Sequence, residues 1–229
     1  MLKPVPSIIS ALAVALVTVS SAAAITGGGI DGDAHPYVGA LVVDGFVECS
    51  GVLISPTVFA TAGHCAADGR RVTVSFDSKL GTGWTLVDGT FRADPARRAD
   101  LGVVVLDAPT AVVPAALPAE GMAESLARKT LVTSVGYGYS GWAADGSFVY
   151  DGFRHAADSP VKRVDKLTIT VSTKSAGPCF GDSGGPQLSG DTVLSLTSGG
   201  SKDCTGRAEG YRLDSSKART FLADFVALP

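Results

Sequence analysis

The string Gly181-Asp182-Ser183-Gly184-Gly185-Pro186, preceded by Cys179-Phe180, places a serine between glycines. A nucleophilic serine needs an exposed hydroxyl and nearby backbone N–H groups directed at the oxyanion that develops during attack. Glycine on either side permits a strained turn and lets a substrate approach closely. The shorter pattern Gly-x-Ser-x-Gly also fits a glycine-rich β-turn, but the six-residue string is far more specific. We therefore expect Ser183 to be a nucleophile.

A second string, Thr61-Ala62-Gly63-His64-Cys65, contains one of only three histidines. A general base must lie within hydrogen-bond reach of the serine, and histidine titrates in the right range. His64 follows a β-rich run and stands beside a cysteine. His35 and His155 have no comparable surroundings, and we interpret them as ordinary surface or loop residues. His64 is the expected general base.

A third string, Asp100-Leu101-Gly102-Val103-Val104-Val105-Leu106, puts a carboxylate at the head of an apolar strand. A carboxylate in such a place is costly unless it has a partner, and a catalytic imidazole would be one. Taken alone, Asp100 also fits a simple turn before a strand. Asp94 is a rival, but no strand follows it directly. We expect Asp100 to orient His64.

Composition indicates a packed globular protein of 229 residues, because 45% of them are hydrophobic and 18% are charged. The net charge of -3 and the absence of Lys/Arg runs argue against a nucleic-acid partner. Residues 1–24 have the pattern of a secretory signal peptide: Lys3, an apolar stretch over 8–19, and Ala22-Ala23-Ala24 as a cleavage site. The apolar stretch is shorter than the ~20 residues that span a bilayer. We expect a secreted, extracellular protein with no stable membrane association after signal removal.

An exported chain meets an oxidising environment, so its four cysteines are expected to form two disulfides. Four cysteines allow three pairings. Metal ligation is the competing interpretation, but Cys49, Cys65, Cys179 and Cys204 contain no closely spaced C-x-x-C pair. We expect neither a metal nor a cofactor.

Short β-rich runs separated by Gly, Pro, Asp and Ser clusters predict an antiparallel all-β fold from Ile25 onward. The clearest expected strands are 37–43, 47–54, 72–76, 101–106, 131–135, 167–171, 193–196 and 210–213. One helix is expected near the end of the chain, with Ser215 or Ser216 as its cap. Its apolar stripe consists of Ala218, Phe221, Leu222, Phe225 and Val226. The Pro/Ala-rich stretch 108–121 is the expected junction of two β halves.

Together these strings resemble the trypsin/chymotrypsin family of serine proteases, over essentially all of residues 25–229. The chain order His, Asp, Ser matches that family, whereas unrelated triad enzymes use other orders. Ile25-Thr26-Gly27-Gly28 resembles its mature N-terminus, and Gly136-Tyr137-Gly138 resembles its Gly-Trp-Gly turn. Several bridges of animal members have no cysteines here, so the chain is most similar to lean bacterial secreted members.

The resemblance implies two six-stranded antiparallel Greek-key β-barrels with a C-terminal helix and a catalytic cleft between the barrels. It implies disulfides Cys49–Cys65 and Cys179–Cys204. It makes the backbone N–H groups of Gly181 and Ser183 the oxyanion hole. It also implies an activation ion pair between the Ile25 amine and Asp182.

Substrate specificity is expected to depend on the pocket beside Ser183. The resemblance places Gly177, six residues before the serine, at the pocket floor, so the floor carries no charge. Ser198, Gly199 and Gly200 form the segment that pairs with substrate backbone, and Ser198 is also expected to hydrogen-bond Asp100. An apolar or aromatic P1 residue should fit.

Glu209 supports the alternative of a Lys or Arg P1 residue, if its carboxylate lies on the rear wall of the pocket. A one-residue gap would put Gly210 there instead. Two other functions are compatible with the same residues. An esterase could use the same triad, and a pseudoprotease could bind a partner without catalysis, although no triad or oxyanion residue is missing. The expected function is a secreted, monomeric serine endopeptidase acting on protein or peptide substrates.

Overall fold

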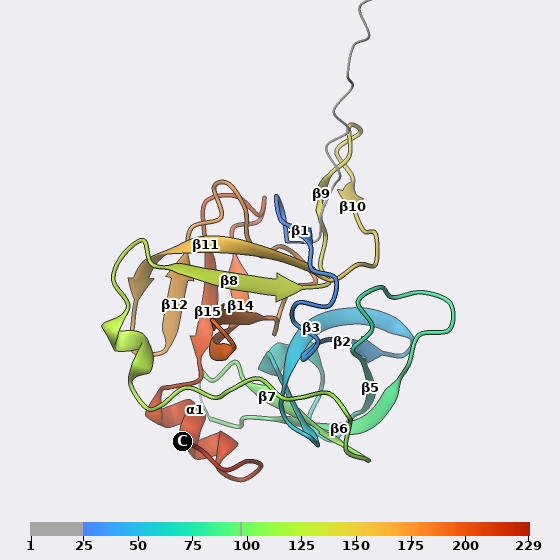
Figure 1. Ribbon diagram of the computed structural model, residues 1–229, viewed down its shortest axis with the longest axis vertical. Helices are drawn as coiled ribbons and strands as arrows, with labels where there is room; N and C mark the ends of the chain where they lie inside the picture. Colours follow the sequence, from blue (N-terminus) through green and yellow to red (C-terminus); the bar gives the residue numbers. More distant parts are fainter. Residues whose placement is uncertain (1–24, 97) are drawn as a thin grey trace, which may run out of the picture.

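Two closed antiparallel β-barrels, each of six strands, form the body of the protein (Figure 1). The computed structural model describes residues 25–96 and 98–229, so the expected signal peptide lies outside the described residues. The sheets and the C-terminal helix confirm the predicted fold class. No helix within the described ranges is long and apolar enough to cross a membrane.

The first barrel closes in the order β2-β3-β4-β7-β6-β5, with β5 returning to pair with β2. Its interior is filled by large apolar side chains with no exposure, among them Leu41, Leu53, Phe59 and Phe91. Its strands are β2 Val38–Val43, β3 Phe46–Ser55, β4 Val58–Thr61, β5 Arg71–Ser75, β6 Val87–Ala93 and β7 Gly102–Leu106.

The second barrel closes because β8 pairs with both β13 and β11. The short strand β1 (Gly29–Ile30) adds to β11, and a separate hairpin joins β9 (Gly141–Trp142) to β10 (Phe148–Val149). In Figure 1 this hairpin extends away from the barrels. The barrel strands are β8 Leu131–Gly136, β11 His155–Val164, β12 Thr168–Val171, β13 Pro186–Ser189, β14 Thr192–Gly200 and β15 Ala208–Arg212.

The C-terminal helix α1 (Ser216–Leu222) is shorter than the apolar stripe predicted for it. Ser215 caps it by accepting a hydrogen bond from the backbone N–H of Ala218. Phe225 and Val226 lie beyond the helix, yet they pack against the core. Short 3-10 helices, η1 (Gly63–Cys65) and η2 (Met122–Ser125), complete the elements.

The stretch 108–121 contacts both barrels. The backbone N–H of Ala115 donates to the carbonyl of Leu53 in the first barrel, over 3.0 Å. Ala116 forms a bridge with Thr192 at the start of β14 in the second.

A buried arginine also joins the barrels. Arg154, 1% exposed, directly precedes β11. Its guanidinium donates to the first-barrel carbonyl oxygens of Val38 (3.0 Å) and Phe76 (3.1 Å), to the Tyr137 hydroxyl (3.1 Å) and to the Asp31 carboxylate (2.8 Å). A buried charge is tolerated when it is paired and hydrogen-bonded in this way.

The interpretation of His155 as a surface or loop residue was wrong. It starts β11 with its side chain 1% exposed, and its Nε2 lies 3.1 Å from the Asp151 carboxylate. Burial lowers the pKa of His155, against the opposing effect of Asp151. His35, in the loop before β2, is partly exposed and pairs with Asp31.

Candidate active site

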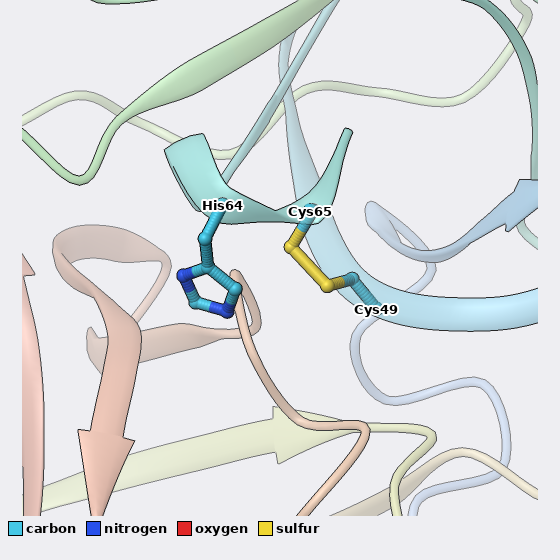
Figure 2. Close-up of side chains that lie close together, drawn as sticks. All are labelled: Cys49, His64 and Cys65. Atoms are coloured by element: carbon cyan, nitrogen blue, oxygen red, sulfur yellow. A yellow bond between two sulfur atoms is a disulfide. The ribbon is translucent and has the colours of Figure 1, made fainter. Parts of the chain in front are cut away.

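His64 lies on the 3-10 turn η1, immediately after β4. The next residue, Cys65, is bonded to Cys49 on β3, so a covalent link fixes this turn to the first barrel. Figure 2 shows the imidazole beside the disulfide. The two sulfur atoms are bonded to each other, so this His/Cys/Cys group offers no thiolates to a metal ion.

Strand pairing brings Asp100 to His64. Thr61 at the end of β4 pairs with Gly102 at the start of β7, so the residues just beyond these strand ends are neighbours. The Asp100 carboxylate accepts hydrogen bonds from His64 Nδ1, 3.0 Å away, and from the His64 backbone N–H at 3.1 Å. The Ser198 hydroxyl, on β14, also donates to this carboxylate. The carboxylate thus orients the imidazole.

The interaction between His64 and Asp100 favours the charged form of the His64 imidazole. The hydrogen bond to Asp100 raises the pKa of His64 above its usual 6.5, and partial burial opposes this rise. Burial pushes the pKa of Asp100 upward, but hydrogen bonds from His64 and Ser198 outweigh it and hold the pKa below 3.8. Asp100 is therefore an anion that stabilises an imidazolium.

Ser183 lies on the loop between β12 and β13, and both barrels hold this loop. Its carbonyl accepts from the backbone N–H of Ser50, over 2.8 Å, and the next N–H, of Gly184, donates to Thr197 at 2.7 Å. Gly184 has φ 77°, and a Cβ there would lie 2.1 Å from the Thr61 hydroxyl. Only glycine fits so close to the first barrel in this left-handed conformation.

His64 and Ser183 both line one cavity of about 280 Å³. The Cys179–Cys204 disulfide forms part of its wall. The residues lining it are His64, Pro178, Cys179, Phe180, Gly181, Ser183, Thr197, Ser198, Gly199, Gly200, Ser201 and Cys204.

Two residues expected in the specificity pocket are not among those lining this cavity. Gly177 is buried, and its backbone N–H donates to the Thr26 carbonyl over 2.9 Å. The Glu209 carboxylate lies 3.4 Å from the Arg207 guanidinium and its side chain is 39% exposed.

Ile25 and Asp182 are both fully buried and are hydrogen-bonded to each other. The Asp182 carboxylate accepts from the backbone N–H groups of Gly138 (2.8 Å), Cys179 (2.9 Å) and Ile25. Burial raises the pKa of Asp182 to about 7 although these three hydrogen bonds oppose it.

Comparison with known proteins identifies the family of the chain. The family model described as Trypsin matches residues 25–220. The chain belongs to the trypsin family. Among solved structures, human heparin binding protein is similar to this trypsin-family chain, with a TM-score of 0.73 and 18% identity, over 88% of this chain and 96% of the other. At that identity the likeness concerns the fold alone. No curated protein matches the sequence.

Ser50 is a site residue that sequence reasoning missed in this member of the trypsin family. Its hydroxyl donates to the carbonyl of Gly181 (3.0 Å) and accepts from the backbone N–H of Tyr137 (2.9 Å). It therefore ties the loop that contains Gly181 to the first barrel. No pattern around Ser50 distinguishes it from any other strand serine.

Proposed function

We propose that this trypsin-family chain is a secreted serine endopeptidase that cleaves protein or peptide substrates through an acyl-enzyme. The observation that carries the proposal is the hydrogen-bonded set of His64, Asp100 and Ser198 at a cavity that Ser183 also lines. This arrangement supplies a nucleophile, a base and an anionic group that orients the base.

In the proposed mechanism, His64 takes the proton of Ser183 as the Oγ attacks the scissile carbonyl. The backbone N–H groups of Gly181 and Ser183 bind the resulting oxyanion. His64 then delivers the proton to the leaving amine, and water repeats the sequence to release the acyl group. Asp100 keeps the imidazole in the required tautomer and stabilises the imidazolium. The raised pKa of His64 is consistent with that role.

The proposed P1 preference is apolar or aromatic. Among the residues lining the cavity, His64 is the only ionisable one, so no carboxylate faces a P1 side chain there. The Lys/Arg alternative requires Glu209 to turn from Arg207 toward the cavity. A panel of Phe, Leu, Lys and Arg substrates decides between them: a strong Lys/Arg preference that Glu209→Gln abolishes would overturn the apolar assignment.

Covalent labelling of Ser183 by a fluorophosphonate tests catalysis itself. Ser183→Ala should leave folding intact and lower kcat on the order of 10⁶-fold, as loss of the nucleophile does in Ser-His-Asp enzymes. Retention of more than about a hundredth of the turnover would make the assignment of Ser183 wrong. An unlabelled but folded wild-type protein would favour the pseudoprotease. Turnover of esters without peptides would favour the esterase.

Secretion and activation are proposed together. The disulfides Cys49–Cys65 and Cys179–Cys204 are typical of extracellular proteins. Signal removal after Ala24 would free the Ile25 amine beside Asp182, so export would itself activate the enzyme. N-terminal sequencing of the secreted protein tests this, and an active enzyme starting elsewhere would contradict it.

The name heparin binding protein describes the human relative, and nothing favours that function here. Heparin is a polyanion, whereas this chain has a net charge of -3 and no Lys/Arg run. We propose a monomer without nucleic-acid, metal or cofactor partners.

A further inference from the structure

A second and larger cavity, of about 560 Å³, lies beside the catalytic one. We call it the aromatic cleft, after the six rings that line it: Phe46, Trp84, Tyr137, Tyr139, Tyr150 and Phe180. Phe46 begins β3 and Trp84 lies in the loop before β6, so both come from the first barrel. Tyr139 and Tyr150 flank the β9–β10 hairpin, whose place at the edge of the molecule is visible in Figure 1.

Four of the rings that line the aromatic cleft are exposed, namely Phe46, Tyr139, Tyr150 and Phe180. Phe46 is 71% exposed and Phe180 is 48% exposed. A cluster of solvent-exposed aromatic side chains is typical of a binding site, because each ring buries a large apolar area when a ligand contacts it.

Ring contacts with the hairpin support one wall of the cleft. Phe148 stacks on Tyr139 with ring centroids 5.0 Å apart, and it meets Phe180 edge-on at 5.3 Å. Trp142 packs on the same Phe148 ring at 4.1 Å. Phe180 is thus supported from the hairpin side, between the aromatic cleft and the catalytic cavity.

The two cavities share Phe180 and Gly181, and this sets the direction of a bound chain. The proposed mechanism puts the scissile carbonyl at the N–H groups of Gly181 and Ser183, and the resemblance to the family implies that the acyl side pairs with Ser198–Gly200, which line the catalytic cavity. The residues after the scissile bond would then leave past Gly181, away from the catalytic cavity. Gly181 also lines the aromatic cleft, so this cleft is next to the expected path of the leaving group.

We propose that the aromatic cleft binds the leaving-group side of the substrate and favours a large apolar or aromatic side chain there. This inference rests on the proposed function. Glu48 is the one charged residue among those lining the cleft, and its side chain is exposed. Its carboxylate disfavours an acidic residue at the same position through like-charge repulsion.

Partition of the acyl-enzyme between water and an added amine tests the inference. In aminolysis the amine nitrogen bonds to the acyl carbon, the bond to Ser183 Oγ breaks, and the amine proton passes through His64 to that oxygen. The amine must occupy the leaving-group side, so its yield reports binding in the aromatic cleft. Both products come from one acyl-enzyme, and their ratio therefore does not depend on how fast the acyl-enzyme forms.

In the unaltered protein, phenylalaninamide should give an aminolysis-to-hydrolysis ratio about tenfold above that of glycinamide, since burial of an aromatic side chain supports at least that factor. Phe46→Ala and Tyr150→Ala should each reduce this preference about threefold or more. The matched control is Val113→Ala, at a side chain 76% exposed outside the cleft, which should keep the preference. Glu48→Gln should raise the yield with aspartamide.

Three outcomes would overturn the inference. Equal ratios for phenylalaninamide and glycinamide would remove it while leaving the proposed function intact. Failure of every ester to form an acyl-enzyme would remove both. A dimer in sedimentation that Phe46→Ala dissociates would mean that a second copy of the chain covers the cleft.

Discussion

One residue left in front of Ile25 should make the protein lose stability between about pH 4 and pH 8. The preceding residue converts the Ile25 amine into an amide, which donates a hydrogen bond to Asp182 but carries no charge. The buried carboxylate then has three N–H donors and no cation. Ionising it inside the protein is therefore unfavourable.

The size of the loss follows from the pKa of Asp182, which burial raises from 3.8 to about 7 in the continuous chain. Since each pKa unit is worth about 1.4 kcal/mol, the difference amounts to about 4 kcal/mol. The folded state binds this proton more tightly than the unfolded state. Its contribution is therefore complete below pH 3.8, and it is lost as the pH rises through about 7.

A chain that begins at Ile25 should behave differently, because its ammonium pairs with the Asp182 carboxylate. The pair raises the folded pKa of the amine above its usual 7.7–8.0. Its stabilisation is complete below that range and fades at more alkaline pH, and activity should decline with it.

Urea unfolding of two Ser183→Ala proteins measures the effect without autolysis. One protein begins at Ala24 and the other at Ile25, so all other titrations are common to both and cancel in the difference. Asp182→Asn in the longer protein is the control and should flatten its pH dependence. Parallel stability curves for the two proteins would refute the reasoning.

Three further predictions concern the site and its supports. The acid limb of kcat/KM should have a midpoint above 6.5, because the hydrogen bond to Asp100 raises the pKa of His64; a midpoint at or below that value would contradict the pairing. Replacing Cys49 and Cys65 together by alanine should lower the free energy of unfolding by about 3 kcal/mol, given their 16-residue separation; an unchanged urea midpoint would count against this. Gly184→Ala should cost about 3 kcal/mol, since its Cβ would meet the first barrel at 2.1 Å with φ at 77°; a stable, active variant would show that the loop can move.

Sequence patterns predicted many of the apolar strands but missed the short apolar strand β4 and the polar strand β11. Each of the eight expected strands overlaps an observed strand. The long strand β11 was missed because it carries Asp158, Pro160, Lys162 and Arg163, which local propensity assigns to loops. Pairing with β8 and β12 overrides that propensity. The helix was overextended because Phe225 and Val226 continue the apolar stripe, although they pack on the core outside α1.

The specificity pocket could not be derived from sequence because it depends on strand register. A register shift between Thr197 and Gly199 sets which residues face the cavity. Glu209 and Gly210 are adjacent on β15 and so point to opposite faces of the sheet. A one-residue uncertainty in alignment therefore exchanges a carboxylate for a glycine. In the structure the Glu209 carboxylate pairs with Arg207.

The buried guanidinium of Arg154 has a consequence for the choice of substrates. Separating the barrels would strip this charge of the carbonyl oxygens of Val38 and Phe76, at a cost of several kcal/mol. The proposed catalytic groups would thus be held at a fixed separation, and widening the gap between the barrels to admit a bulky, folded target would be unfavourable. The substrate must supply the flexibility instead. If the chain is the endopeptidase proposed above, it would cut where a target chain is already extended or can unfold locally, so exposed loops and termini would be its cleavage sites.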